Sequence, residues 1–215
     1  MFVLGLTGSI GMGKSAAAAM LRRMGLPLHD ADRAVHRLLA KGGAAVAAVE
    51  AAFPGVIADG AVDRERLAAK VFEDRAALKR LEGILHPAVR RATRAFLGRQ
   101  ARAGRSLVVL DIPLLFETGG AGLCDAVVVV AAPPFVQRAR VMARRGMTPA
   151  RFQAILAKQM PDREKRRRAD FVVNTGLSKA ATLRQLRAIV TLLRRQPERY
   201  RRGRTNSRRP YTKGP

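Results

Sequence analysis

Short apolar runs recur along the chain at residues 2–6, 26–29, 107–110, 126–132 and 171–173. They lack the alternation of a half-buried strand and therefore predict strands buried on both faces, as in a parallel sheet. The segments between them place apolar residues at helical spacing and predict helices over 15–24, 31–41, 63–72, 78–85, 89–103, 134–145, 148–159 and 179–195. Strands that alternate with helices predict an α/β fold.

Capping and breaking residues refine this pattern. Asp63 and Thr148 are N-cap candidates, and Pro149 fits the first helical position that follows Thr148. Because proline disfavours helical conformation in the residue before it, His86-Pro87 predicts a break between two helices. Residues 162–168 are highly charged and are predicted to be exposed.

Composition narrows the class of protein. The chain has 215 residues, 48% of them hydrophobic, which is enough for one globular domain with a sizeable core. Cys124 is the only cysteine, so no internal disulfide framework can form, and a reducing cytoplasm is expected. No apolar run approaches the ~20 residues of a membrane span, and the N-terminus does not resemble a signal peptide.

The net charge of +25 is unusually high. From Arg194 onward, nine basic residues face one acidic residue, and residues 196–215 lose the apolar periodicity. We expect a disordered basic tail over 196–215. The remaining excess is spread along the chain and is compatible with polyanionic substrates, a nucleic-acid surface or an Arg-rich composition.

The chemistry begins at Gly8-Ser9-Ile10-Gly11-Met12-Gly13-Lys14-Ser15, which fits the phosphate-loop pattern G-x-x-x-x-G-K-[ST] between a strand and a helix. Its glycines allow a sharp turn that points consecutive N–H groups at one anion, and the helix N-terminus adds positive charge. Lys14 can reach the β- and γ-phosphates, and the Ser15 hydroxyl can bind Mg²⁺. The pattern predicts a nucleoside triphosphate site.

Acidic residues follow two of the predicted strands. Asp30 and Asp32 come after the second strand, and the carboxyl ends of parallel strands open onto the ligand crevice. One of them can accept a proton or support Mg²⁺, while the alternative is that Asp30 caps a helix and Asp32 lies in its first turn. Asp111 ends the run 107–110, in the manner of an acid that binds Mg²⁺ beside a phosphate loop.

Other candidate site residues each have a functional and a structural interpretation. Residues 112–117 either line a substrate pocket or pack into the core. Arg140 and Arg144 are spaced for one helical face, where they either cover the γ-phosphate or form a solvated basic surface. A lone histidine such as His86 is, by composition, most simply a structural hydrogen-bonding residue.

The ordered set of motifs resembles the dephospho-coenzyme A kinase family. The set comprises residues 6–15, Asp30-Ala31-Asp32, Leu85-His86-Pro87, Pro113 to Glu117, Gln137 to Gly146, Gln159 and Asn174-Thr175-Gly176. Many families share the phosphate loop, but the order is specific and spans about residues 2–195. Ser9 and Ala16 depart from the usual glycine and threonine without removing the anion cradle or the Ser15 hydroxyl.

The resemblance implies a P-loop three-layer α/β kinase with a parallel sheet, a helical insertion over 33–100 that receives the substrate, and a helical lid over 137–168. The kinase domain would cover residues 1–195. The implied reaction is ATP-dependent phosphorylation of the ribose 3′-hydroxyl of dephospho-CoA, with Mg²⁺, to give coenzyme A and ADP. We expect a monomer or weak oligomer, without membrane or nucleic-acid partners other than through the tail.

The resemblance also implies roles for single residues. The catalytic residues would be Lys14, Arg140, Arg144 and the general base Asp32. ATP would contact Gly8, Gly11, Met12, Gly13, Lys14, Ser15, Ala16, Asn174 and Gly176. The acceptor substrate would contact Asp30, Asp32, His86, Pro113, Leu114 and Leu115. Mg²⁺ would be bound by Ser15 and Asp111.

Three rival functions follow from the same residues. Another small-molecule P-loop kinase, of the nucleoside monophosphate or shikimate type, would share the phosphate loop and the Asp-x-Asp. A GTPase lacks support because no Asn-Lys-x-Asp motif occurs. An RNA-associated ATPase would use the basic tail and predicts salt-dependent RNA binding.

Overall fold

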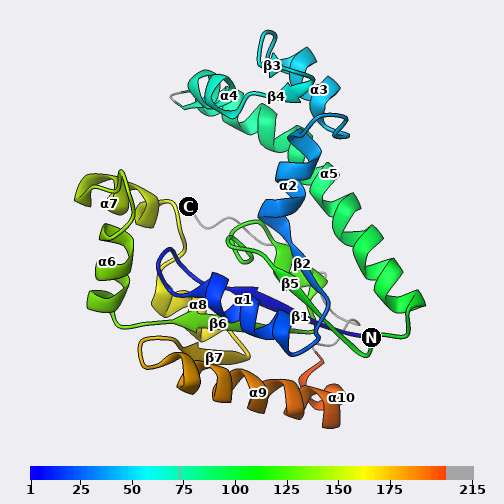
Figure 1. The fold of residues 1–215 in the computed structure, drawn as a ribbon, viewed down its shortest axis with the longest axis vertical. Helices are drawn as coiled ribbons and strands as arrows, with labels where there is room; N and C mark the ends of the chain where they lie inside the picture. The colour runs from blue at the N-terminus through cyan, green and yellow to red at the C-terminus, as the bar shows by residue number, and fades with distance from the viewer. Residues whose placement is uncertain (73, 202–215) are drawn as a thin grey trace. The chain divides into compact units, whose positions relative to one another are not determined.

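The computed structural model describes residues 1–72 and 74–201. These residues divide into two compact units: residues 1–28 together with those from 103 onward, and residues 29–102 (Figure 1). The insertion predicted over residues 33–100 lies within the second unit. Nowhere in the described ranges is a helix both long enough and apolar enough to cross a bilayer.

A five-stranded sheet has the order β2-β5-β1-β6-β7 (Figure 1); four of its strands belong to the first unit, and β2 spans the chain position at which the division into two units falls. The pairs β1–β5, β1–β6 and β6–β7 are parallel, and Leu6 pairs with both Asp111 and Val128. The strands are β1 Phe2–Thr7, β2 Leu28–Asp30, β5 Leu107–Asp111, β6 Ala126–Ala131 and β7 Phe171–Asn174. The predicted α/β fold with a parallel sheet is confirmed.

The helices of the first unit include the four that the sequence pattern predicts near 15–24, 134–145, 148–159 and 179–195, and three that it does not predict. They are α1 Lys14–Arg23, the 3₁₀ helix η1 Gly120–Leu123, α6 Pro134–Met142, α7 Pro149–Ala157, α8 Asp162–Arg168, α9 Lys179–Arg195 and α10 Pro197–Tyr200. Thr148 caps α7 as predicted, because its side chain accepts a hydrogen bond from the Arg151 N–H.

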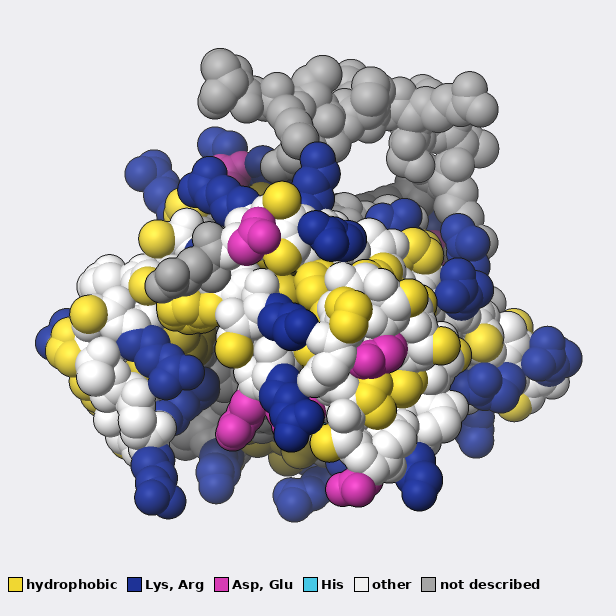
Figure 2. Space-filling view, turned by 90° about the horizontal axis from the view of Figure 1, so that it is seen from above, with side chains coloured by type: hydrophobic (Ala, Val, Ile, Leu, Met, Phe, Trp, Pro, Cys, Tyr) yellow, Lys and Arg dark blue, Asp and Glu magenta, His cyan; other side chains and the backbone are white. Residues whose placement is uncertain are grey.

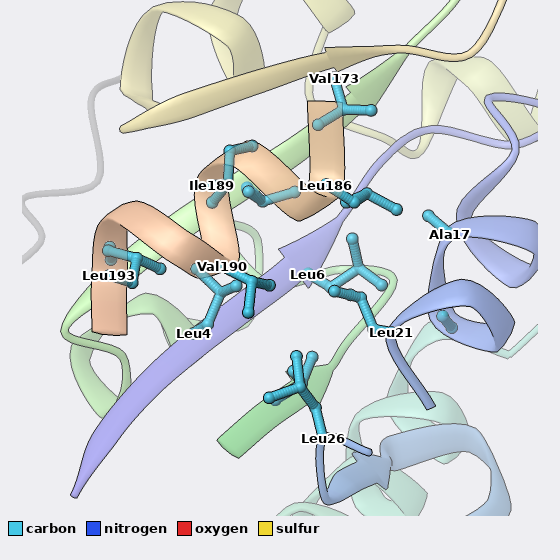
Figure 3. Packing of buried hydrophobic residues seen from close by; sticks show 14 of the residues in the cluster. Leu4, Leu6, Ala17, Leu21, Leu26, Val173, Leu186, Ile189, Val190 and Leu193 are labelled. Carbon is cyan, nitrogen blue, oxygen red and sulfur yellow. The ribbon is translucent and has the colours of Figure 1, made fainter. Parts of the chain in front are cut away.

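One face of the sheet is covered by α1 and α9. Figure 3 shows Leu4 and Leu6 of β1 directed toward Leu21 of α1 and toward Leu186 and Val190 of α9. All of these side chains are almost completely buried. Burial of each leucine contributes about 1.5–3 kcal/mol, so this layer holds β1 and α1 on either side of the phosphate loop.

The other face of β1 packs against the chain that follows β5. A side chain at Gly5 would begin 2.8 Å from Cys124 Sγ and 2.9 Å from a Leu115 methyl group. Glycine therefore allows Leu115 and Cys124 to fill this space, and both are buried. Cys124 is a core residue.

The second unit is helical, with one small hairpin. Its elements are α2 Ala31–Leu39, α3 Val46–Ala52, β3 Ile57–Ala58, β4 Ala61–Val62, α4 Arg64–Val71 and α5 Arg75–Arg102. Asp59 and Gly60 form the hairpin turn with positive φ angles of 50° and 79°. Asp63 caps α4, as predicted, by accepting from the N–H groups of Glu65 and Arg66. The core of this unit includes Val49, Val56, Leu67 and Leu81.

The predicted break at His86-Pro87 is wrong. Helix α5 runs through both residues without interruption. An internal proline costs about 3 kcal/mol because it removes a hydrogen bond and crowds the preceding turn. Leu81 before the proline and Phe96 after it are both buried, so tertiary packing holds both halves in one helix.

Two further boundaries differ from expectation. Helix α6 ends at Met142, so Arg144 lies beyond it and does not share a helical face with Arg140. The predicted disordered tail starts too early, because α10 is folded and Tyr200 packs on Phe171 with ring centroids 5.2 Å apart. The part of the tail prediction that concerns residues 202–215 lies outside the described residues.

Candidate active site

The phosphate loop joins β1 to α1 and is closely enclosed. Gly11 and Gly13 have φ angles of 76° and 83°, which L side chains rarely adopt. A Cβ at Gly8 would lie 2.5 Å from a Val130 methyl group and 2.8 Å from the Val130 carbonyl oxygen. The glycines are thus required both by the turn and by the neighbouring chain.

Lys14 and Asp111 form the charged centre of this loop. The Lys14 ammonium donates to Asp111 Oδ1 at 2.7 Å, and the side chains are only 17% and 4% exposed. The parallel β1–β5 register, in which Leu6 pairs with Asp111, brings the carboxylate under the loop. Ser15 and Ala16, in the first turn of α1, are exposed. A cation, a carboxylate and a hydroxyl are therefore gathered at one end of the sheet.

The backbone of the loop is fixed by side chains from distant segments. Thr175 Oγ1 donates to the Met12 carbonyl at 2.8 Å, and the Ala132 N–H contacts Met12 Sδ at 3.1 Å. Gln137 Nε2 donates to the Ile10 carbonyl at 2.7 Å, and the Ile10 N–H donates to Gln159 Oε1 at 3.1 Å. Sequence patterns single out these two glutamines only as motif positions and do not predict this role.

Residues 112–117, which follow β5, include both buried and exposed side chains, so neither pocket lining nor core packing describes all of them. Leu115 is buried in the core, whereas Leu114 is 37% exposed. The Pro113 carbonyl accepts from Thr7 Oγ1 at 2.9 Å, which ties the segment to the start of the phosphate loop. At its end, Glu117 Oε1 accepts from the Met160 N–H at 2.9 Å.

Glu117 also forms an ion pair with a lysine that the sequence predicts to be exposed, and this prediction is wrong. The charge run predicts an exposed Lys165 among residues 162–168. Its side chain is instead 0% exposed, and its Nζ lies 2.9 Å from Glu117 Oε1. A charge run at helical spacing turns one side chain inward every three or four residues, and here α8 packs against β6. A buried ammonium requires such a partner.

The two predicted lid arginines have different surroundings. Arg140 makes a two-point contact with Thr175, donating to Oγ1 at 3.0 Å and to the carbonyl oxygen at 2.6 Å. Arg144 is exposed. The loop that Arg140 holds contains Asn174 and Gly176; the Asn174 carboxamide accepts from the Gly176 N–H at 2.8 Å.

In the second unit, Asp30 and Asp32 have the helix-terminal geometry that was the alternative to a catalytic role. Asp30 caps α2 by accepting from the Arg33 N–H at 3.0 Å, and Asp32 is exposed in the first turn. A cap and a first-turn position leave the Asp32 carboxylate accessible. His86 is half-buried inside α5.

His29, beside Asp30, was not singled out from the sequence. It is buried, stacks near Phe96 at 5.2 Å between ring centroids, and its Nε2 lies 3.1 Å from Thr93 Oγ1. Since Thr93 Oγ1 donates to the Val89 carbonyl, the His29 Nε2–H is the donor in this pair. Burial, and then the nearby Arg37, lowers its pKa.

A phosphate loop between a buried strand and a helix, with a lysine–carboxylate pair beneath it, defines the class of P-loop nucleotide-binding proteins. Within that class, the family model for dephospho-CoA kinase matches residues 2–179. The chain belongs to the dephospho-CoA kinase family.

Individual relatives agree with this assignment. The chain is 62% identical over 194 residues to a dephospho-CoA kinase of Paramagnetospirillum magneticum, covering 90% of this chain and 92% of the relative. It is 59% identical over 196 residues to a dephospho-CoA kinase of Mesorhizobium japonicum, covering 91% and 98%. The crystal structure of TT1252 from Thermus thermophilus is similar with a TM-score of 0.77 at 38% identity, covering 89% of this chain and 97% of that one.

Proposed function

We propose that this protein transfers the γ-phosphoryl group of ATP to the ribose 3′-hydroxyl of dephospho-CoA, which gives coenzyme A and ADP and completes coenzyme A biosynthesis. The observation that carries the proposal is the family match over residues 2–179, which joins the phosphate loop and the helical insertion in one chain. The single cysteine suits a cytoplasmic location.

The phosphate loop supplies positioning and charge. We assign the ATP phosphates to N–H groups of residues 8–16 at the N-terminus of α1, except the Ile10 N–H, which donates to Gln159. Lys14, which is already desolvated against Asp111, would neutralise charge on the transferring group. A preorganised cation in a half-enclosed site stabilises developing charge more than a solvated one does.

The residues present fit a magnesium ion. Asp111 and the Ser15 hydroxyl offer the hard oxygen donors that Mg²⁺ prefers, and they stand at the end of β5 and the start of α1. When bound, the ion would neutralise charge on the phosphate oxygens. Without a bound ion, Lys14 and Asp111 neutralise each other. This pairing lowers the cost of burying the Asp111 carboxylate.

The acceptor side of the proposal rests on the second unit. Asp32 would take the proton of the 3′-hydroxyl, and its exposed position at the start of α2 allows a substrate to reach it. Asp30 and His86 of the second unit, together with Pro113 and Leu114 of the first, would contact dephospho-CoA, whereas Leu115 is buried in the core. Arg140 and Arg144 would act from the lid, and Asn174 and Gly176 would lie beside the adenine.

The charge of the protein suits anionic substrates. Figure 2 shows Lys and Arg side chains spread over the visible face, with few acidic ones between them. A net charge of +25 attracts nucleotides and coenzyme A precursors over long range at low salt. We expect this attraction to weaken as ionic strength rises.

A coupled ADP-release assay tests the function directly. ADP release by the purified protein with Mg-ATP is measured in the presence of dephospho-CoA, shikimate, AMP, CMP or no acceptor. Strong stimulation by dephospho-CoA alone is expected. Stimulation by one of the other acceptors instead would retain the nucleotide site and reject the proposed substrate.

A further inference from the structure

Ile10, in the middle of the phosphate loop, is held by two glutamine side chains of opposite hydrogen-bonding polarity. Gln137 donates through Nε2 to the Ile10 carbonyl at 2.7 Å, and Gln159 accepts through Oε1 from the Ile10 N–H at 3.1 Å. Gln137 is only 7% exposed. Both backbone groups of one loop residue are therefore satisfied by side chains more than a hundred positions away in sequence.

The helix that carries Gln137 also lies directly against the loop. A Cβ at Gly11 would meet a Val141 methyl group at 2.5 Å and the Gln137 carbonyl oxygen at 3.0 Å. One turn of α6 thus contacts two successive residues of the loop. A displacement of α6 cannot leave the loop unchanged, because close-packed interiors transmit such shifts.

The chain after α7 is anchored just as firmly. Gln159 reaches Ile10, the next residue, Met160, donates its N–H to Glu117, and Lys165 forms a buried ion pair with the same carboxylate. Breaking this pair would leave a buried charge without a partner. Glu117, which is paired with Lys165, therefore holds the backbone next to Gln159.

We infer that Gln137 and Gln159 form a clamp on Ile10 that positions the phosphate loop for phosphoryl transfer. The clamp also fastens both ends of segment 138–158, which includes Arg140 and Arg144, to the loop. The two glutamines are positioning residues, since their hydrogen bonds go to the loop backbone. The inference deepens the proposed kinase function and rests on it.

The clamp has a defined kinetic consequence. The N–H groups of the loop must meet the transferring phosphate in one geometry, and a misplacement of about 1 Å can cost on the order of a hundredfold in rate. Loss of either glutamine should lower kcat and weaken ADP binding. The KM for dephospho-CoA should stay unchanged, because neither glutamine is among the residues assigned to the acceptor.

The first experiment compares Gln137→Leu, Gln159→Leu and the control Gln196→Leu. Gln196 is exposed and follows α9, away from the phosphate loop in sequence. We expect kcat to fall about tenfold to a hundredfold in the first two variants, ADP affinity by isothermal titration calorimetry to weaken, and the control to match the wild type.

The second experiment uses the polarity of the clamp. Gln159→Glu keeps an oxygen that accepts from the Ile10 N–H, whereas Gln137→Glu removes the donor and places a carboxylate against the Ile10 carbonyl. Gln159→Glu and Gln137→Glu add the same negative charge, so both variants repel ATP to a similar extent. Gln159→Glu should recover part of the activity that Gln159→Leu loses, and Gln137→Glu should recover none relative to Gln137→Leu.

The possible results distinguish a failure of the clamp from a failure of the proposed function. Wild-type kcat and ADP affinity in both leucine variants would overturn the clamp, as would an activity loss fully explained by a lower melting temperature. Equal recovery by the two glutamate variants would overturn the assigned polarity. If the wild type fails to phosphorylate dephospho-CoA, the proposed function fails, while ADP affinities of the variants still decide the clamp.

Discussion

Two acids of the first unit are paired with enclosed cations, whereas two acids of the second unit cap helices. In the first unit, Asp111 pairs with Lys14 and Glu117 pairs with a fully buried Lys165. In the second unit, Asp30 and Asp63 are partly exposed and cap helices α2 and α4. Buried charges need an internal partner, whereas a capping carboxylate remains partly hydrated. The comparison teaches that an acid after an apolar run can either pair with a buried cation or cap a helix, and that the run does not decide between these roles.

The buried pair of Glu117 and Lys165 should give the largest effect on stability. Lys165→Met leaves Glu117 without its cation and should lower the free energy of unfolding by about 3–5 kcal/mol, measured by urea denaturation. The double variant Glu117→Gln with Lys165→Met removes both charges and should be clearly more stable than Lys165→Met alone. Additive losses would show that the two charges are not energetically paired.

Lys14 should give the largest effect on activity in the first unit. Lys14→Ala removes the cation from the transferring phosphate and should reduce kcat by roughly a hundredfold or more in the ADP-release assay. Arg23→Ala, at the other end of α1, serves as the control and should leave kcat unchanged. Near-normal turnover by Lys14→Ala would contradict the mechanism.

The two aspartates at the start of α2 sharpen the comparison within the second unit. Asp32→Asn should lower kcat by about a hundredfold while ATP affinity changes little, because a general base acts on the acceptor hydroxyl. Asp30→Asn keeps a capping side chain and should have a much smaller effect on kcat. The reverse order, measured by steady-state kinetics, would assign the base to Asp30.

The smallest effect is expected from pH, through His29. Its pKa in the folded protein is lowered by burial, so the unfolded chain binds a proton more readily than the folded one. His29 should therefore contribute a loss of stability as pH falls through and below its ordinary pKa of about 6.5. Urea denaturation between neutral pH and mild acid, with His29→Gln beside the wild type, should show a weaker pH dependence in the variant.

Much of the fold could be predicted because its signals are local. The strand, glycine-rich loop and helix at residues 2–24 are determined by apolar runs, glycine flexibility and helix propensity. The caps Thr148 and Asp63 lie where their side chains can reach the first free N–H groups. Asp111 lies beneath the loop because a parallel register aligns strand ends.

Other features could not be predicted, because they depend on contacts between distant segments. Pro87 opposes helix locally, yet burial on both sides of it keeps α5 whole. Lys165 has the sequence surroundings of a solvated residue, and only the packing of α8 brings it to Glu117. Arg140 is found on Thr175, which no spacing indicates.

The amino-acid sequence by itself determined the class of site, the alternation of strands and helices in the first unit, and the family, because the phosphate loop and its neighbours are short motifs whose chemistry is local. Only the tertiary structure decided which side chains hold that loop in place. Gln137 and Gln159 reach Ile10 from over a hundred residues away, and hydrogen bonds of that range are formed only when the sheet and its helices are packed together.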